Sequence, residues 1–246
     1  MNTQIGKKLI WLSEIDSTNK YLTTLSKEQL DEGLAVATNN QVEGRGQRGN
    51  TWESEKDKNI TFSFILYPKF LKVQEQFILS QAISLGICDM LLQYTKGISI
   101  KWPNDIYVNN NKIAGILIEN AISSAQLDQS IVGIGLNVNQ KTFSDDIPNP
   151  TSLALETGYV FDLKETIGLL CSRISARYND LRNNGFDVIQ AEYLNLLYRR
   201  NEFYTYSSDG KKFEAIIAGV KGTGELILES RNGERKEFGF KEISFF

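Results

Sequence analysis

A polar loop carries the first residues whose types and spacing could do chemistry. The stretch GRGQRGNTW, from Gly44 to Trp52, combines glycines, two arginines and a tryptophan. Glycines let the backbone approach a ligand closely, and the guanidinium groups of Arg45 and Arg48 can form paired hydrogen bonds with carboxylates or phosphates. The pattern indicates a site for an anion. A flexible surface loop with incidental charges is the competing explanation, and the strand-to-helix setting of a dinucleotide-binding loop is missing.

A second set of residues surrounds a proline corner. The sequence KWPND, from Lys101 to Asp105, is followed by KIAGILIE, from Lys112 to Glu119. Proline removes a hydrogen bond from a strand, so the chain gives up sheet regularity at this corner. A tight turn is the simplest explanation of the corner, and Lys112 could either reach solvent or meet an anion.

Two further segments place small polar side chains or glycines where a ligand could approach. Ser17, Thr18 and Asn19 lie at the expected start of a helix, which they could cap, or they could face a ligand. The sequence GIGLNVN, from Gly133 to Asn139, puts glycines inside a strand, as expected for close contact with a ligand or another backbone. A plain strand ending in a turn explains it nearly as well.

The composition excludes several kinds of chemistry. The chain has no histidine, which removes the commonest general base, the usual nucleophilic triads and the usual zinc ligand. The net charge of −3 and a pI near 5.3 argue against a nucleic-acid-binding protein. Any chemistry must therefore depend on charge and positioning.

The length and hydropathy predict a folded protein of one main domain and one small one. The chain has 246 residues, of which 41% are hydrophobic. We find no apolar run long enough for a signal peptide or a membrane span, so we expect a cytoplasmic protein without membrane contact. Cys88 and Cys171 lie in apolar, helical stretches and are expected to be buried free thiols.

The elements that must position these residues form an antiparallel-rich sheet with helices. Alternating hydrophobicity predicts strands over residues 9–12, 33–38, 59–68, 98–102, 105–108, 113–119 and 130–139, with a hairpin turn at 109–111. Helical spacing predicts helices over 17–25, 73–94, 164–183 and 188–199. Residues 202–246 have short strands broken by glycine turns, which predicts a small β-barrel, so we divide the chain into 1–199 and 200–246.

Taken in order, the motifs closely resemble those of the biotin–protein ligase family. The resemblance is carried by Ser17–Asn19, Gly44–Trp52, Lys101–Asp105, Lys112–Glu119 and Gly133–Asn139. It implies an α+β catalytic domain with a mixed, largely antiparallel sheet and flanking helices, similar to class II aminoacyl-tRNA synthetases, followed by a small SH3-like domain. Because the motifs begin so near Met1, we expect a ligase-only form without an N-terminal DNA-binding domain.

The resemblance also implies the reaction. Biotin and ATP with Mg²⁺ are the expected substrates, biotinyl-5′-AMP is the intermediate, and a lysine of a biotin carboxyl carrier domain of acetyl-CoA carboxylase or a related enzyme is the acceptor. No prosthetic group and no nucleic-acid partner are expected, and a homodimer is compatible with the family. The competing functions are a lipoate–protein ligase or octanoyltransferase, and a biotin sensor without catalysis.

The resemblance assigns roles to particular side chains. The expected biotin site is Ser17, Thr18, Asn19, Gln41, Arg45, Gly46, Gln47, Trp52, Lys112 and Gly115. The expected adenylate site is Arg45, Arg48, Trp52, Asn104, Lys112 and Asn137. The expected catalytic groups are Arg45, Arg48, Lys112 and Asp105, and no protein ligand to a metal is assigned.

Three of these assignments leave an alternative or depart from the family pattern. Trp52 could be plain core packing. Asn104 and Asp105 are assigned first to holding the turn and second to placing magnesium. Asp105 is also a candidate acceptor for the proton of the carrier lysine, a role that groups of the carrier or water could fill equally well. Many family members have an arginine where this chain has Gln47, and the missing charge predicts weaker retention of the adenylate.

Overall fold

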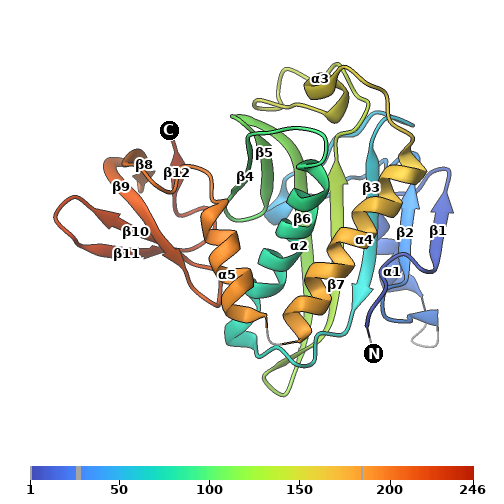
Figure 1. Ribbon diagram of the computed structural model, residues 1–246, viewed down its shortest axis with the longest axis horizontal. Helices are drawn as coiled ribbons and strands as arrows, with labels where there is room; N and C mark the ends of the chain where they lie inside the picture. The colour runs from blue at the N-terminus through green and yellow to red at the C-terminus, as the bar shows by residue number, and fades with distance from the viewer. Residues whose placement is uncertain (1, 26–28, 184) are drawn as a thin grey trace.

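Two sheets form the framework of the protein (Figure 1). The computed structural model describes residues 2–25, 29–183 and 185–246. The larger sheet has seven strands in the order β1-β2-β3-β7-β6-β5-β4. Their bounds are β1 Leu9–Leu12, β2 Ala35–Thr38, β3 Ile60–Leu66, β4 Ile98–Lys101, β5 Asp105–Val108, β6 Asn111–Ser123 and β7 Gln126–Leu136.

The larger sheet is mixed but mostly antiparallel. β1 and β2 run parallel, and the other neighbouring pairs of described strands are antiparallel. Strand β3 is buried along its whole length, with α1 packed against it and most of its apolar side chains in the same hydrophobic core as residues of α2 and α4. The predicted α+β fold with a largely antiparallel sheet and flanking helices is confirmed.

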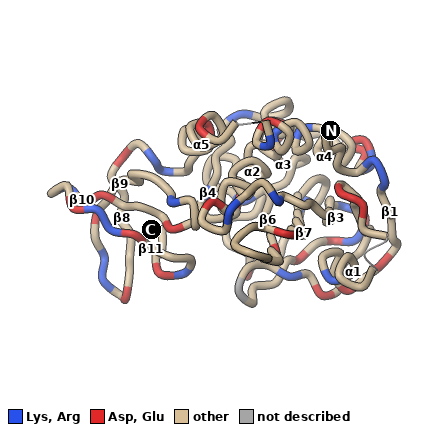
Figure 2. The backbone as a smooth tube through the Cα atoms, turned by 90° about the horizontal axis from the view of Figure 1, so that it is seen from below, with Lys and Arg blue, Asp and Glu red and all other residues tan. Residues whose placement is uncertain are grey.

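Helices cover the sheet unequally (Figure 2). α2 packs on β4, β5 and β6, and α4 and α5 pack on α2, whereas α1 contacts β2, β3 and β7 from the opposite face. α2 is therefore buried nearly all round, between the sheet and two other helices. The helix bounds are α1 Thr18–Thr24, α2 Phe77–Leu91, α3 Leu153–Thr157, α4 Leu163–Arg182 and α5 Phe186–Asn195.

The crossing of α2 and α4 depends on Gly86. A Cβ atom there would lie 2.7 Å from Cα of Ile174, so a larger residue must push the helices apart. We expect Gly86→Ala to lower the free energy of unfolding by about 1–3 kcal/mol, as overpacking a core does. Gly168→Ala, in α4 with no neighbouring atom within 4 Å, should raise it by about 0.5–1 kcal/mol. Urea denaturation measures both, and two variants of equal stability would contradict the expectation.

The smaller sheet fits the predicted SH3-like domain. Its five antiparallel strands have the order β11-β10-β9-β8-β12. Nε1 of Trp102 donates to the carbonyl of Gly224 at 2.9 Å, and this hydrogen bond joins the smaller sheet to the part of the chain that contains the larger sheet. The strand bounds are β8 Tyr204–Ser208, β9 Lys211–Val220, β10 Leu226–Ser230, β11 Arg235–Phe238 and β12 Ser244–Phe245. The predicted boundary at 199/200 falls between α5 and β8 and stays a prediction.

A few elements differ from those predicted. The helix predicted from residue 73 begins as a short 3-10 helix, Val73–Glu75, and α2 starts only at Phe77. The amide of Phe77 donates to the carbonyl of Gly222 and not to a carbonyl of a preceding helical turn. β6 runs on to Ser123 because its hairpin with β7 projects beyond the other strands. Helix α3 was not predicted, although Ser152 caps it and Gly158 ends it with a φ of 79°.

Both cysteines are buried free thiols, as predicted for Cys88 and Cys171. Burial raises the pKa of each thiol, which keeps the reactive thiolate form rare. In the part of the chain that the structure describes, no helix combines the length and apolar character that crossing a membrane requires.

Candidate active site

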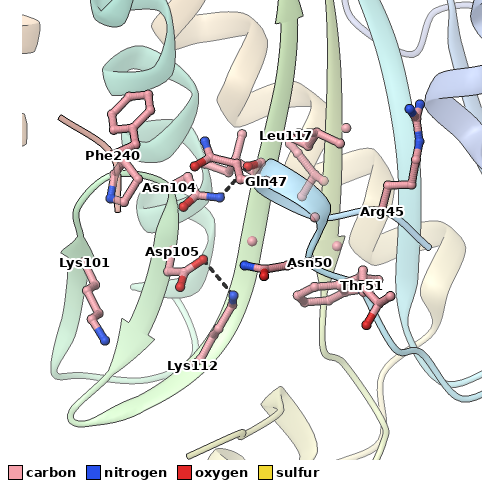
Figure 3. A pocket seen from close by; sticks show the side chains of 18 of the residues that line it. Arg45, Gln47, Asn50, Thr51, Lys101, Asn104, Asp105, Lys112, Leu117 and Phe240 are labelled. Atoms are coloured by element: carbon pink, nitrogen blue, oxygen red, sulfur yellow. Dashed lines mark hydrogen bonds and ion pairs between the residues drawn. The ribbon is translucent and has the colours of Figure 1, made fainter. Parts of the chain in front are cut away.

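A cavity of about 400 Å³ lies where the large sheet meets the smaller one (Figure 3). This volume is typical of a small-molecule site. Its walls come from the start of α1, the polar loop, strands β3 to β7 and the end of the C-terminal sheet. Of the predicted site residues, the lining includes Ser17, Thr18, Asn19, Gln41, Arg45, Gly46, Gln47, Trp52, Asn104, Asp105, Lys112 and Gly115.

Lys112 and Asp105 form an ion pair on the cavity wall, with 2.7 Å between Nζ and Oδ1 (Figure 3). The register of β5 against β6 shifts between Ile106 and Tyr107, and such a bulge turns the following side chains to the other face. Lys112 thereby lies on the same face as Gly115, where a Cβ atom would be 3.5 Å from Cε of the lysine. The fold thus holds a mostly buried cation against its counter-ion.

Trp52 lies over two glycines of neighbouring strands. Gly115 of β6 pairs directly with Gly135 of β7, and a Cβ at Gly115 would lie 3.2 Å from Cζ3 of the indole, while one at Gly135 would overlap the ring. Nζ of Lys112 is 5.7 Å from the ring centre. The buried Nε1 has no partner among the described residues. Core packing explains the contacts with the glycines but not a buried donor left unpaired.

Polar side chains around the start of α1 form one end of the cavity. Nδ2 of Asn19 donates to Oε2 of Glu119 at 2.6 Å, and Oδ1 accepts from the hydroxyl of Ser63 at 2.5 Å. Oε1 of Gln41 accepts from the amide of Thr18 at 2.8 Å. This end therefore offers oriented donors and acceptors.

The polar loop forms the outer wall. Nη2 of Arg45 is 3.4 Å from Oε2 of Glu119, and both side chains are a little under half exposed. An exposed pair of this kind contributes at most about 1 kcal/mol, so a ligand can displace it cheaply. Arg48 lies in the short 3-10 helix Gln47–Gly49, but its side chain is outside the described part of the structure, and its role stays a prediction.

Three predicted residues make structural hydrogen bonds. Ser17 caps α1, and Nδ2 of Asn104 donates to the carbonyl of Ile116 at 2.8 Å, which holds the turn. Asn137 is not among the cavity-lining residues, because its Nδ2 donates to the carbonyl of Thr151 at 2.9 Å. Its Oδ1 is buried without a partner among the described residues, and contact with the adenylate stays a prediction.

The C-terminal sheet contributes a wall of the cavity that was not predicted from the sequence. Nζ of Lys101 donates to the hydroxyl of Tyr107 at 3.0 Å and lies 5.5 Å from the ring centre of Phe245. Burial, and then the charge of Asp105, raise the pKa of Tyr107 to about 12, so the phenol stays neutral beside the lysine. Lys101 could have been found from its place in the KWPND motif. Nothing in the local sequence signals Phe245.

The arrangement can bind an anion beside an apolar group and stabilise charge on a phosphoryl group. It offers cations, a flat aromatic wall and a polar end within one cavity. Within residues 2–25, 29–183 and 185–246, no three carboxylate or thiol side chains gather closely enough to hold a metal ion.

Comparison with known proteins connects this geometry to a family. The model of the biotin/lipoate A/B protein ligase family matches residues 11–137, which include Trp52, Asp105 and Lys112. The chain belongs to this family.

The similarity to individual members of the biotin/lipoate ligase family covers more of the chain than the family model does. The bifunctional ligase/repressor BirA of Bacillus spizizenii is 31% identical over 94% of this chain and 72% of its own length. The biotin–[acetyl-CoA-carboxylase] ligase of Paracoccus denitrificans is 28% identical over 91% of this chain and 95% of its own. The biotin protein ligase of Aquifex aeolicus, solved with biotin and ATP, superposes with a TM-score of 0.81 at 30% identity, covering 98% and 99% of the two chains.

These relatives confirm the resemblance predicted from the five motifs. The sequence relatives and the solved structures both indicate a ligase that acts on biotin and ATP and has this fold.

Proposed function

We propose that the protein is an ATP-dependent biotin–protein ligase. It activates biotin as biotinyl-5′-AMP with release of pyrophosphate and transfers the biotinyl group to one lysine of a biotin carboxyl carrier domain. The observation that carries the proposal is the Lys112–Asp105 pair beside the indole of Trp52, which puts a held cation next to an apolar surface. That combination suits a ligand with an apolar chain ending in a carboxylate.

The first step joins two anions. A carboxylate oxygen of biotin attacks the α-phosphorus of ATP, and pyrophosphate leaves. Lys112, Arg45 and Arg48 cancel the repulsion and stabilise the charge that gathers on the phosphoryl oxygens. Magnesium bound to ATP would offset part of the charge on its phosphates.

Biotin lies along the cavity in one direction. Its apolar chain follows Trp52 where Gly115 leaves room, and its ureido ring meets Ser17, Thr18, Asn19 and Gln41 at the polar end. The backbone at Gly46 and Gln47 closes over the ligand. The adenosine lies on the Asn104 side, with Asn137 behind it.

The second step transfers the biotinyl group. The ε-amine of the carrier lysine attacks the carbonyl carbon of the mixed anhydride, the bond to the phosphate oxygen breaks, and AMP leaves. Positioning of the two reactants supplies most of the acceleration. The proton of the amine passes to the carboxylate of Asp105.

The partner is a carrier domain of acetyl-CoA carboxylase or a related carboxylase, and the enzyme works in the cytoplasm. Two buried free thiols fit a reducing compartment. Pairing of two copies through their sheets is the oligomer we propose.

The test is mass spectrometry of a carrier domain incubated with the protein, biotin, ATP and magnesium, with lipoate in a parallel reaction. We expect a gain of one biotinyl group at a single lysine. A lipoyl adduct would instead assign the chain to the lipoate branch of the family, and tight biotin binding without transfer would make it a sensor.

Gln47 gives a prediction about the intermediate. We expect Gln47→Arg to slow the release of biotinyl-5′-AMP about tenfold, because one charge-assisted hydrogen bond is added near the phosphate. Release of radiolabelled adenylate on gel filtration measures it. Gln93→Arg, which adds the same charge in the exposed turn after α2, is the control, and equal release from both variants would contradict the prediction.

A further inference from the structure

The cavity is cationic although the protein as a whole is acidic. Among the described lining residues, four carry a positive charge and one carries a negative charge: Arg45, Lys101, Lys112 and Lys241 against Asp105. The whole chain has a net charge of −3. One carboxylate of biotin needs one cation, so the excess indicates a ligand that brings several negative charges into the same cavity.

Lys101 keeps its positive charge available. No carboxylate of the described residues forms an ion pair with it, and Asp105, which is opposite Lys101 in the register of β4 and β5, is paired with Lys112. Nζ of Lys101 donates to the hydroxyl of Tyr107 at 3.0 Å and lies 5.0 Å from the centre of that ring and 5.5 Å from that of Phe245. A neutral phenol and two aromatic rings therefore hold the ammonium without cancelling its charge.

The order of the strands puts Lys101 at one end of a row of groups on one face of the sheet. The row contains Gly135 of β7 beneath Trp52, Lys112 of β6, Asp105 of β5 and Lys101 of β4. Figure 3 shows Lys101 and Lys112 on opposite sides of Asp105. Because neighbouring strands are about 4.8 Å apart, the backbones that carry the two lysines are separated by roughly 10 Å.

This order matches the geometry of phosphoryl transfer. In an in-line displacement, the attacking and leaving oxygens lie on opposite sides of the phosphorus. The proposed function places the apolar chain of biotin along Trp52, so its carboxylate reaches Lys112 from the β7 side. The leaving pyrophosphate then departs toward β5 and β4, where Lys101 lies.

We propose that Lys101 forms the subsite for the leaving group, where its ammonium binds the β- and γ-phosphates of ATP. The inference rests on the proposed biotin-ligase function. As a carboxylate oxygen of biotin bonds to the α-phosphorus, the bond from that phosphorus to the bridging oxygen breaks, and its electron pair stays on the β-phosphate. Lys101 stabilises the charge that pyrophosphate gains. It acts in adenylation alone, because pyrophosphate has left before the carrier lysine attacks.

The experiment measures the two half-reactions separately. Adenylation is followed as pyrophosphate release from biotin and ATP, and transfer is followed by mass spectrometry of a carrier domain after biotinyl-5′-AMP is supplied. We expect Lys101→Met to lower kcat/KM for ATP about tenfold and to raise the inhibition constant of inorganic pyrophosphate by a similar factor, the effect of losing one charge-assisted hydrogen bond. The rate of transfer should stay unchanged.

Lys212→Met is the matched control. Lys212 also lies over an aromatic ring, with Nζ 4.2 Å from the ring centre of Phe246, but it is exposed and outside the described lining. Both half-reactions should be normal in this variant. Equal slowing of both half-reactions in Lys101→Met would show that Lys101 only supports the wall at Phe245 and would overturn the proposal. A loss of transfer alone would also overturn it, because Lys101 would then act on the carrier.

Tyr107→Phe guards against misfolding of Lys101→Met. It keeps the ring and removes the hydroxyl that accepts from Lys101, so the inhibition constant of pyrophosphate should rise about threefold, the effect of one weaker hydrogen bond, with transfer unchanged. Unaltered pyrophosphate inhibition in Tyr107→Phe would overturn the proposal even if Lys101→Met does not fold. If the unaltered protein forms no biotinyl-5′-AMP, the proposed function fails. If it forms and transfers the intermediate and neither variant changes pyrophosphate inhibition, only the leaving-group subsite fails.

Discussion

Lys112→Met should lower the rate of adenylate formation by about a hundredfold to a thousandfold, the usual effect of removing one group that stabilises transition-state charge. Methionine keeps the length and apolar stem of the side chain, so the loss reports the ammonium group. The rate is measured as pyrophosphate release with biotin and ATP saturating. Binding of biotin should weaken less than the rate falls, because the charge on the phosphoryl oxygens is greatest during transfer.

Two controls separate this role from structural support. Lys69→Met removes another lysine in an ion pair, with Asp128 at 3.1 Å, far from the cavity lining, and should leave the rate unchanged. Lys112→Met leaves Asp105 without its counter-ion, so the double variant with Asp105→Asn removes both charges. Recovery of the rate in the double variant would show that Lys112 acts only by neutralising Asp105.

Gly135→Ala should produce the second largest loss. A methyl group at this position would overlap the indole of Trp52. The ring would have to move away from Gly135, which changes the shape of the cavity. We expect kcat/KM for biotin to fall by about a hundredfold, because misplacing a wall of the site misplaces the ligand against Lys112. Steady-state kinetics and thermal unfolding of the same preparation measure the effect.

Gly219→Ala is the matched control for Gly135→Ala. It also replaces a strand glycine, but the nearest atom to its added Cβ is Cδ1 of Ile227 at 3.7 Å, an ordinary contact. We expect normal kinetics from this variant. If Trp52 were core packing alone, Gly135→Ala would lower the melting temperature but leave kcat/KM of the folded enzyme unchanged.

The sequence allowed most of the sheet and one side of the cavity to be predicted. Strand periodicity placed β3 and β7, and the glycines of the GIG and AGI stretches marked positions of close approach, now Gly115 and Gly135 beneath Trp52. These signals are local, since a strand pattern and a missing side chain can both be read within a few residues.

The remaining site could not be predicted because it depends on register and on distant contacts. The bulge near Ile106 places Lys112 on the same face as Asp105, and no residue type in the local sequence indicates that bulge. Ser63 reads as an ordinary member of a buried strand until β3 is paired with Gly133 and α1 is packed on it. Phe245 reaches the wall only through the packing of the second sheet.

The cavity draws its walls from segments that stretch from Ser17 to Phe245. Contacts so far apart in sequence form slowly, whereas the β5–β6 hairpin with Lys112 and Asp105 can form early. An incompletely folded chain would hold the charged pair but not the enclosure that retains a reactive anhydride. The enclosed cavity therefore exists only once segments from both ends of the chain have packed together.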